Sequence, residues 1–315
     1  MAKQPGPLRH IPVMLDEAVE GLSVRSDGHY LDGTFGRGGH ARAVLARLGE
    51  HGRLLLMDRD PAAIAAAQAE FAGDRRVSIR HANFSSLAEW DATADGLDGV
   101  LFDLGVSSPQ LDEAARGFSF MADAPLDMRM DTTRGESAAD FLARADEREI
   151  MQVLWDFGEE RQGRRIAHAI VTDRETTPFT RTTQLAALIE RVVGRHEPGK
   201  HPATRSFQAL RIRVNGELDA LADGLSAALE RLHVGGRLVV ISFHSLEDRV
   251  VKLFIRDQSG RVQNSRRGPP VVARPARLRA VGKAHFPGAA ELAANPRSRS
   301  AVLRVAEKLP QQVAA

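Results

Sequence analysis

The chain has 315 residues, of which 43% are hydrophobic and 27% charged, and it contains no cysteine. These fractions are typical of a folded globular protein, and the length suggests one large domain with an insertion, or two domains. The absence of cysteine excludes disulfides, Cys-ligated zinc, iron–sulfur clusters and catalysis by a thiolate nucleophile.

The apolar segments are short, and none approaches 18 consecutive residues, so we expect no membrane span. Residues 1–10 lack the apolar core of a signal peptide, and we therefore expect a cytoplasmic protein. The net charge is only +2, yet residues 261–304 carry ten Lys and Arg against one acid, Glu291. This basic stretch predicts a polyanionic partner such as a nucleic acid, with a solvated tail as the alternative.

The first third of the chain alternates short apolar runs with helical patterns. Strands are predicted at residues 29–32, 53–57, 77–80 and 99–104. A helix is expected after the glycine run, since Ala41, Val44, Leu45 and Leu48 fall on one face. Asp60 and Pro61 predict the N-cap and first residue of a second helix. This alternation predicts an α/β fold with a doubly wound parallel sheet.

The fifth strand, residues 237–242, comes much later in the chain. Apolar residues from Phe207 to Leu232 recur every three or four positions, which predicts one long crossover helix ending at Gly235 and Gly236. Residues 105–203 exceed an ordinary crossover connection and show mainly helical patterns. We therefore predict a discontinuous core at 1–110 and 204–315 and an inserted helical domain at 111–203.

The end of the fifth strand leads into a further helix. Residues 245–248 fit a capping box, in which Ser245 and Asp248 would satisfy the first turn. His244, Glu247 and Asp248 also suggest metal ligands, but capping explains the acid more simply, and we predict no metal. Residues 258–299 are rich in Arg, Pro and Gly and are expected to form loops before a last strand at 300–305.

A cofactor site is suggested by a strand, a glycine-rich loop from Gly33 to Gly39, a helix, and then Asp58 at the end of the next strand. Such a layout lets the backbone approach a nucleotide while the acid accepts hydrogen bonds from the ribose hydroxyls. The alternative is that the glycines only form a tight turn for packing of the helix on the strand. The loop departs from GxGxxG, and Asp32 at its entrance would repel a pyrophosphate but attract an ammonium group. We therefore favour S-adenosylmethionine over a nicotinamide dinucleotide.

Aspartates follow three of the predicted strands, at Asp32, Asp58 and Asp103. Ligands of open α/β sheets bind at the carboxyl ends of the strands. We expect the three carboxylates to converge there and to form part of the cofactor and reaction site.

Six separated motifs resemble those of the bacterial ribosomal RNA small-subunit methyltransferase H family, also called MraW. They are residues 32–40 (DGTFGRGGH), 103–110 (DLGVSSPQ), 116–120 (RGFSF), 125–131 (PLDMRMD), 201–205 (HPATR) and 242–249 (SFHSLEDR). The resemblance runs from about His10 to Glu307. It implies a Rossmann-like class I methyltransferase core with an inserted all-helical subdomain.

The resemblance further implies an enzyme that uses S-adenosyl-L-methionine to methylate N4 of a cytosine near the P site, in the decoding centre of 16S rRNA. The small ribosomal subunit would then be its partner. The cofactor positions of the family carry over onto Gly38, Gly39, His40, Asp58, Phe84, Asp103 and Gln110. No role is carried over onto the N-terminal extension to Arg9 or onto residues 266–279.

The chemistry of the residues agrees with transfer to an exocyclic amine, because methylation of pyrimidine carbon-5 commonly uses a cysteine adduct. Asp103 would flank the amine and the cofactor, or would only bind the cofactor. Phe118 and Phe120 are candidates for stacking on an unstacked base, with a place in the interior of the inserted domain as the alternative.

Other polar residues have open assignments. Asp127, Arg129 and Asp131 either read a base edge or pair with one another. Arg205, which follows His201 at the start of the long helix, would bind phosphate or serve structure. The basic stretch from Arg261 onward is predicted to contact phosphates. Two competing functions are a nicotinamide-dependent oxidoreductase and a non-catalytic ribosome-assembly factor.

Overall fold

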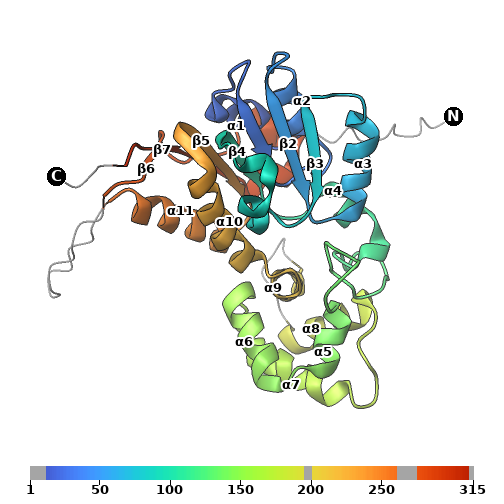
Figure 1. Cartoon of the computed structure of the whole chain (residues 1–315). Coiled ribbons are helices and arrows are strands. Elements are labelled where there is room, and N and C mark those ends of the chain that lie inside the picture. Colours follow the sequence, from blue (N-terminus) through green and yellow to red (C-terminus); the bar gives the residue numbers. More distant parts are fainter. Residues whose placement is uncertain (1–11, 195–200, 261–274, 312–315) are drawn as a thin grey trace, which may run out of the picture. The chain divides into compact units, whose positions relative to one another are not determined.

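The computed structural model describes residues 12–194, 201–260 and 275–311 (Figure 1). The chain divides into two compact units. Unit 1 consists of residues 1–105 and 218–315, and unit 2 consists of residues 106–217. In the described part, no helix has both the length and the apolar character that a membrane crossing needs.

Unit 1 is built on a seven-stranded sheet with the order β3-β2-β1-β4-β5-β7-β6. Neighbouring strands from β3 to β5 are parallel, whereas β7 is antiparallel to both β5 and β6. The strands are β1 (His29–Asp32), β2 (Arg53–Asp58), β3 (Val77–His81), β4 (Leu97–Asp103), β5 (Leu232–Ser242), β6 (Leu278–Ala280) and β7 (Val302–Lys308). The predicted doubly wound α/β core is confirmed.

Side chains of alternate strand residues enter two separate cores, one on each face of the sheet. Leu54 and Leu56 pack with helices α1 (Leu15–Leu22), α2 (Gly39–Leu45) and α3 (Pro61–Phe71). Leu55 and Met57 pack with the opposite group. That group is η1 (Phe84–Glu89), α10 (Glu217–Arg231) and α11 (Ser245–Gln258). The sheet is therefore buried on both sides, which explains its continuous apolar runs.

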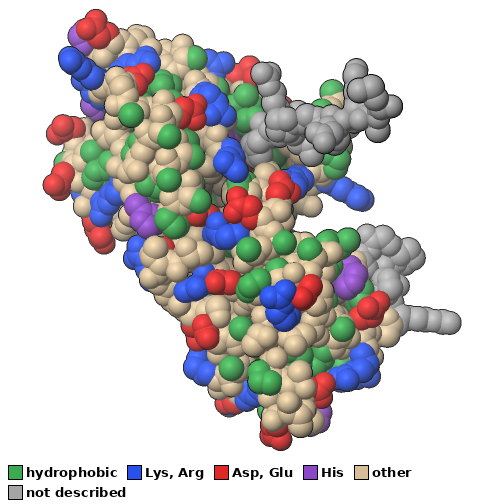
Figure 2. Space-filling model, turned by 90° about the vertical axis from the view of Figure 1, so that its right-hand side faces the viewer, with side chains coloured by type: hydrophobic (Ala, Val, Ile, Leu, Met, Phe, Trp, Pro, Cys, Tyr) green, Lys and Arg blue, Asp and Glu red, His purple; other side chains and the backbone are tan. Residues whose placement is uncertain are grey.

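Unit 2 is helical, as the sequence predicts for the inserted part. Its elements are α4 (Ser108–Asp112), η3 (Ala114–Arg116), α5 (Ala138–Arg144), α6 (Glu147–Gly158), α7 (Gly163–Asp173), α8 (Thr182–Val193) and α9 (Thr204–Asn215). Apolar side chains from α5 to α9 form its own core, including Phe141, Ile150 and Leu185. On the face drawn in Figure 2, side chains of both charges are interspersed with hydrophobic ones.

The single long crossover helix was a wrong prediction. Gly216, with φ +56°, ends α9 in a left-handed conformation, and α10 begins at the next residue. Phe207 and Leu210 then belong to the core of unit 2, whereas Leu221 and Leu225 belong to that of unit 1. The apolar period continues through the break because both helices are amphipathic. Helix α9 belongs to unit 2, and not to the discontinuous core domain in which the sequence placed it.

The start of α11 also differs from the prediction by one residue. His244 is the N-cap, and it forms the capping box with Glu247 rather than Ser245 with Asp248. Asp248 instead accepts from Arg304 Nε at 2.7 Å. Residues 261–274, which follow α11, lie outside the described residues. Four short elements were not predicted from the sequence: η2 (Asp91–Thr93), β6, α12 (Ala289–Ala294) and η4 (Pro296–Ser300).

Candidate functional site

The three aspartates singled out in the sequence lie at the carboxyl edge of the sheet. Asp32 ends β1 and is in register with Leu56 of β2 and Leu101 of β4. Asp58 and Asp103 lie two residues beyond these partners, at the ends of β2 and β4. The predicted convergence of the three carboxylates is therefore what the strand register produces.

The glycine loop that follows β1 keeps the backbone close to these strand ends. The N–H of Gly33 donates to Leu101 O at 2.9 Å, and that of Gly36 donates to Asp58 Oδ2 at 2.8 Å. Gly38 has φ +72°, and a Cβ there would lie 2.7 Å from the ring of Phe35. A Cβ on Gly39 would lie 2.1 Å from Pro12 Cγ. Side chains at these positions would fill the space and strain the turn.

Asp58 is held by backbone donors on both carboxylate oxygens. Besides the bond from Gly36, Oδ1 accepts from the N–H of Asp60 at 2.8 Å. Burial raises the pKa of Asp58 to about 6, against the lowering effect of these hydrogen bonds. The carboxylate is thus fixed in position while its charge remains poorly compensated.

Asp32 is only 3% exposed. Its Oδ1 accepts from the N–H of Thr34 at 3.1 Å. Burial raises the pKa of Asp32 to about 7, and the negative charge of Asp58 adds to the rise. The hydrogen bonds from Thr34 do not replace the water that this carboxylate loses in the folded protein.

Asp103 is the least satisfied of the three. Its Oδ1 is buried and has no hydrogen-bond partner among the described residues. Its Oδ2 lies 3.6 Å from His40 Nδ1, and His40 Nε2 lies 3.1 Å from the carbonyl oxygen of Val13. Burial, followed by the charges of Asp32 and Glu247, raises the pKa of Asp103 well above its usual range.

When these carboxylates are ionised, no basic side chain of Lys or Arg among the described residues compensates their negative charge. In the described part of the chain, no Lys or Arg forms an ion pair with Asp32, Asp58 or Asp103. A cation bound here would lower the pKa values of all three groups, whereas a pyrophosphate would be repelled. The arrangement suits a ligand that carries positive charge together with hydroxyl groups.

Phe84 contributes an aromatic ring to unit 1 near the glycine loop. Its ring centroid lies 4.6 Å from that of Phe102 at a tilt of 33°. A Cβ on Gly33 would lie 3.0 Å from Phe84 Cβ, and one on Gly224 would lie 2.4 Å from Phe84 Cδ2. The ring is thus fixed by small residues around it and remains partly exposed.

Gln110 belongs to unit 2, where it is 4% exposed. Its Oε1 accepts from the N–H of Ser107 at 2.9 Å and closes the capping box of α4. This bond gives Gln110 a structural role in its own unit, and the cofactor role implied by the family stays a prediction.

Phe118 and Phe120, the candidates for base stacking, both contact other side chains of unit 2. Phe118 is 8% exposed, with the guanidinium of Arg116 5.9 Å from its ring centroid. Phe120 packs against His201 and Phe207, at centroid distances of 4.5 and 4.9 Å. The interior role left open for these two residues fits what surrounds them, and their stacking on RNA stays a prediction.

Asp127 and Arg129 pair with each other, which is one of the two alternatives expected. Arg129 Nε and Nη2 each lie 2.8 Å from a carboxylate oxygen of Asp127. Asp131 is 4% exposed and pairs with Arg134 rather than Arg129. His201 Nδ1 accepts from the N–H of Ala203, which is a turn contact at the start of α9.

Two residues at the site were not predicted to belong to it: Thr34 was not singled out, and Glu247 was considered only as a metal ligand. Thr34 Oγ1 accepts from the N–H of Asp103 at 2.6 Å and so joins the glycine loop to β4. Glu247, whose charge raises the pKa of Asp103, accepts from the N–H of Phe243 at 2.7 Å. The position of Thr34 inside the glycine run was a signal that could have identified it. No local pattern links Glu247 to Asp103, because the two residues lie 144 positions apart in the chain.

Comparison with known proteins gives consistent matches over nearly the whole chain. Residues 7–309 match the model of the MraW methylase family. The chain is 60% identical over 302 residues to a ribosomal RNA small subunit methyltransferase H of Stenotrophomonas maltophilia (strain K279a), covering 96% of this chain and 94% of that protein. It is 58% identical to the same-named protein of Alcanivorax borkumensis, covering 95% and 97%. A solved structure of a putative rRNA methylase from Clostridium thermocellum is similar with a TM-score of 0.47 at 13% identity, over 95% of this chain and 100% of that one.

Proposed function

Because this chain belongs to the MraW methylase family and is thereby an S-adenosylmethionine-dependent ribosomal RNA small-subunit methyltransferase, we propose that it methylates the exocyclic N4 of a P-site cytosine in 16S rRNA. The observation that carries the proposal is Asp103 Oδ1, a buried carboxylate oxygen without a hydrogen-bond partner in the described structure. A buried acceptor of this kind calls for a donor from a ligand.

The residues at the sheet edge fit S-adenosylmethionine. The backbone of Gly38 and Gly39 would border the cofactor, since a Cβ at either position has no room. Asp32 would face positive charge and Asp58 would accept ribose hydroxyls, while Phe84 would offer an apolar wall. When bound, the cofactor supplies a methyl group on a positively charged sulfur.

Transfer to an amine is supported by the chain's composition. With no cysteine, the chain offers no thiolate for the covalent adduct that carbon-5 methylation commonly uses. The amine of cytosine is a weak nucleophile because its lone pair is delocalised into the ring. A hydrogen bond from the amine to a carboxylate draws electron density back onto the nitrogen.

Asp103 is the residue we assign to this hydrogen bond. Its raised pKa makes the carboxylate a stronger acceptor than an ordinary aspartate and suits it to hold the proton that leaves the amine. The contact with His40 and the bond between its own N–H and Thr34 fix its position at the end of β4. Orientation of this kind can lower a barrier by roughly 7–11 kcal/mol in favourable cases.

The basic segment near the C-terminus is proposed to contact RNA phosphates. Within its described part, Arg304 and Arg279 pair with Asp248 and Glu307, whereas Lys283 and Arg299 are exposed. Arg261, Arg266, Arg267 and Arg274 lie outside the described residues. A substrate in the ribosome also supports the predicted cytoplasmic location.

The test is to incubate the protein with 16S rRNA or small subunits and methyl-labelled S-adenosylmethionine, and to map the label by mass spectrometry. We expect N4-methylcytidine at one decoding-centre position. Label at another atom or in another region would contradict the proposal, and no label with either substrate would favour a non-catalytic assembly factor. RNA binding should also weaken steeply with salt if the basic segment contacts phosphates.

A cheaper measurement tests which cofactor the folded protein binds. S-adenosylmethionine should raise the melting temperature of the protein, because a ligand that binds only the folded state stabilises it. A nicotinamide dinucleotide should leave the melting temperature unchanged.

A further inference from the structure

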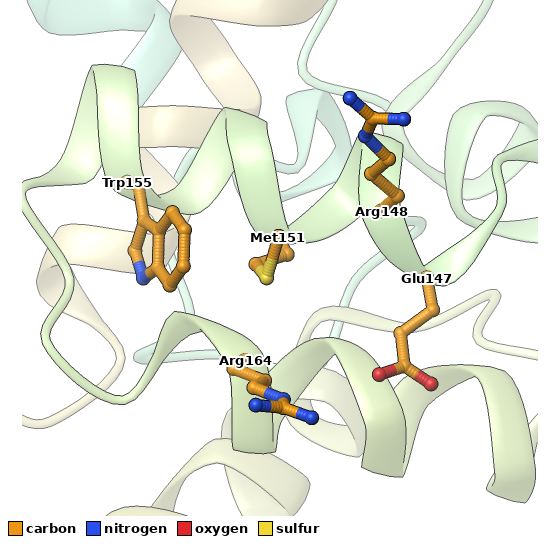
Figure 3. A pocket seen from close by; sticks show the side chains of 5 residues that line it. All are labelled: Glu147, Arg148, Met151, Trp155 and Arg164. Carbon is orange, nitrogen blue, oxygen red and sulfur yellow. The ribbon is translucent and has the colours of Figure 1, made fainter.

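A hollow on the surface of unit 2 lies outside everything assigned so far. It has a volume of about 370 Å³, which is within the range of small-ligand sites, and it lies between α6 and α7 (Figure 3). Its lining residues are Glu147, Arg148, Met151, Trp155 and Arg164. All of them belong to unit 2, so the hollow is complete within that unit.

Trp155 is the main apolar group of the hollow, and it is 43% exposed. Glu147, Met151 and Trp155 follow one another at four-residue intervals and share one face of α6. Gly163 leaves room for the indole, because a Cβ there would lie 2.7 Å from Trp155 Cδ1. The indole therefore rests on the start of α7 and still presents surface to solvent.

The arginines around the hollow differ from three other arginines of unit 2 that are held in ion pairs. Arg144, Arg181 and Arg191 are each paired with a carboxylate at 2.5–3.2 Å. In the described part of the chain, Arg148 and Arg164 form no ion pair, and both are exposed. Glu147, the acid of the hollow, is engaged by His168 Nδ1 at 3.0 Å. The arginine charge at this surface is left available for an anion.

An exposed indole beside free guanidinium groups is the chemistry that recognises single-stranded nucleic acid. Every base has a face that stacks on an aromatic ring, and guanidinium groups bind phosphate oxygens. A protein partner would ordinarily need a broader apolar surface than Trp155 and Met151 provide. We infer that this hollow binds an unpaired nucleotide of the substrate RNA, with the base on Trp155 and the adjoining phosphates at Arg148 and Arg164.

This inference rests on the proposed RNA substrate and adds a contact to it. The first experiment measures the affinity of the full-length protein for a 16S rRNA fragment that contains the target cytosine. Trp155→Ala should weaken binding about 5- to 100-fold, whereas Trp155→Phe should keep most of the affinity. Arg164→Gln should reduce the slope of the salt dependence by about one. Arg191→Gln is the matched control, because it removes an equal charge from an arginine that Asp173 already pairs.

A second measurement does not depend on a loss of affinity. The chain has two tryptophans, so the Trp90→Phe variant leaves Trp155 as the only one. We expect its fluorescence to change on titration with the RNA fragment. An unchanged emission, together with unaltered affinity of folded Trp155→Ala, would overturn the inference.

Two further outcomes separate the explanations. If Trp155→Ala weakens binding to intact small subunits but not to protein-free rRNA, the occupant is a protein and the inference fails. Mapping the methylated position on the same preparations keeps the proposed function distinct. Wild-type N4-methylcytidine with normal RNA binding by Trp155→Ala would refute only the Trp155 site, whereas methylation elsewhere would refute the proposed function.

Discussion

In unit 2, Asp127 is held by two nitrogens of Arg129 and its pKa is lowered, while in unit 1 Asp103 has a buried oxygen without a partner and its pKa is raised. The contrast extends to their neighbours. Asp123 and Glu136 of unit 2 pair with arginines and have lowered pKa values. Asp32 of unit 1 has a raised one.

The direction of the pKa shift distinguishes carboxylates that stabilise the fold from carboxylates that are available to bind a ligand. A paired carboxylate contributes to stability, whereas a buried and uncompensated one costs stability and is found mainly where function requires it. The inserted unit uses its acids as structural elements. The sheet edge of unit 1 collects charge that only a bound cation or donor can satisfy.

The largest effect is expected for Asp103→Asn. If Asp103 acts on the amine, methyl transfer should fall about 100- to 10,000-fold, while the affinity for S-adenosylmethionine stays near that of the wild type. Single-turnover rates and cofactor binding by calorimetry measure the two effects separately. Lost cofactor affinity with normal turnover at saturation would instead make Asp103 a cofactor ligand only.

Asp98 provides the matched control on the same strand. It lies toward the opposite end of β4, where it accepts from the N–H of His29 at 2.9 Å and pairs with Arg25. Asp98→Asn should lower thermal stability and leave the rate of methyl transfer unchanged.

The second prediction concerns pH and the ligand-free protein. The folded-state pKa values of Asp32 and Asp58, about 7 and about 6, lie above the ordinary value of 3.8. The folded state then binds more protons than the unfolded state, and stability falls as pH rises through the folded-state values. At about 1.4 kcal/mol per pKa unit, Asp32 alone contributes a loss of up to about 4 kcal/mol between pH 4 and pH 8.

Melting curves between pH 5 and pH 8 test this loss. Asp32→Asn should flatten the decline and make the ligand-free protein more stable at pH 8, at the expense of cofactor affinity. Asp74→Asn is the control, because Arg76 holds the pKa of Asp74 at about 2 and its removal should not alter the slope in this range. A wild-type melting temperature that rises from pH 5 to pH 8 would contradict the assignment.

The third prediction tests the glycine loop. Gly38→Ala should lower the free energy of unfolding by about 3 kcal/mol, because it combines a left-handed backbone with a Cβ 2.7 Å from Phe35. Cofactor affinity should fall with it. Gly235→Ala isolates the backbone term, since Gly235 has φ +84° and nothing within 4 Å of an added Cβ. Equal losses of stability in chemical denaturation would show that packing around Gly38 is not tight.

Much of unit 1 was predictable because parallel strands buried on both faces are continuous apolar runs. Strand β1 was predicted with the bounds that the structure has, and the register of parallel strands brings their terminal aspartates together. The break at Gly216 was not predictable from periodicity, since the residues on either side keep the same apolar spacing while serving different cores.

The partners of charged residues were the least predictable part of the site. Sequence spacing allowed Arg129 to pair with Asp127 or with Asp131, and only the folded turn selects Asp127. Thr34 and Glu247 contact or influence Asp103 across distances of 69 and 144 positions in the chain. Such long-range contacts leave no local pattern in the sequence.

The smallest expected effect concerns the pair Asp127 and Arg129, for which the sequence left open whether they read a base edge or pair with each other. If they serve only unit 2, Asp127→Asn and Arg129→Gln should each cost about 1 kcal/mol of stability. The double variant should show coupling of similar size in a double-mutant cycle. Its affinity for the 16S rRNA fragment and its rate of methyl transfer should then equal those of the wild type. A loss of RNA affinity in Arg129→Gln, beyond what its stability explains, would instead mean that the ion pair opens to read RNA. The contrast between structural acids in unit 2 and ligand-directed acids in unit 1 would then no longer hold.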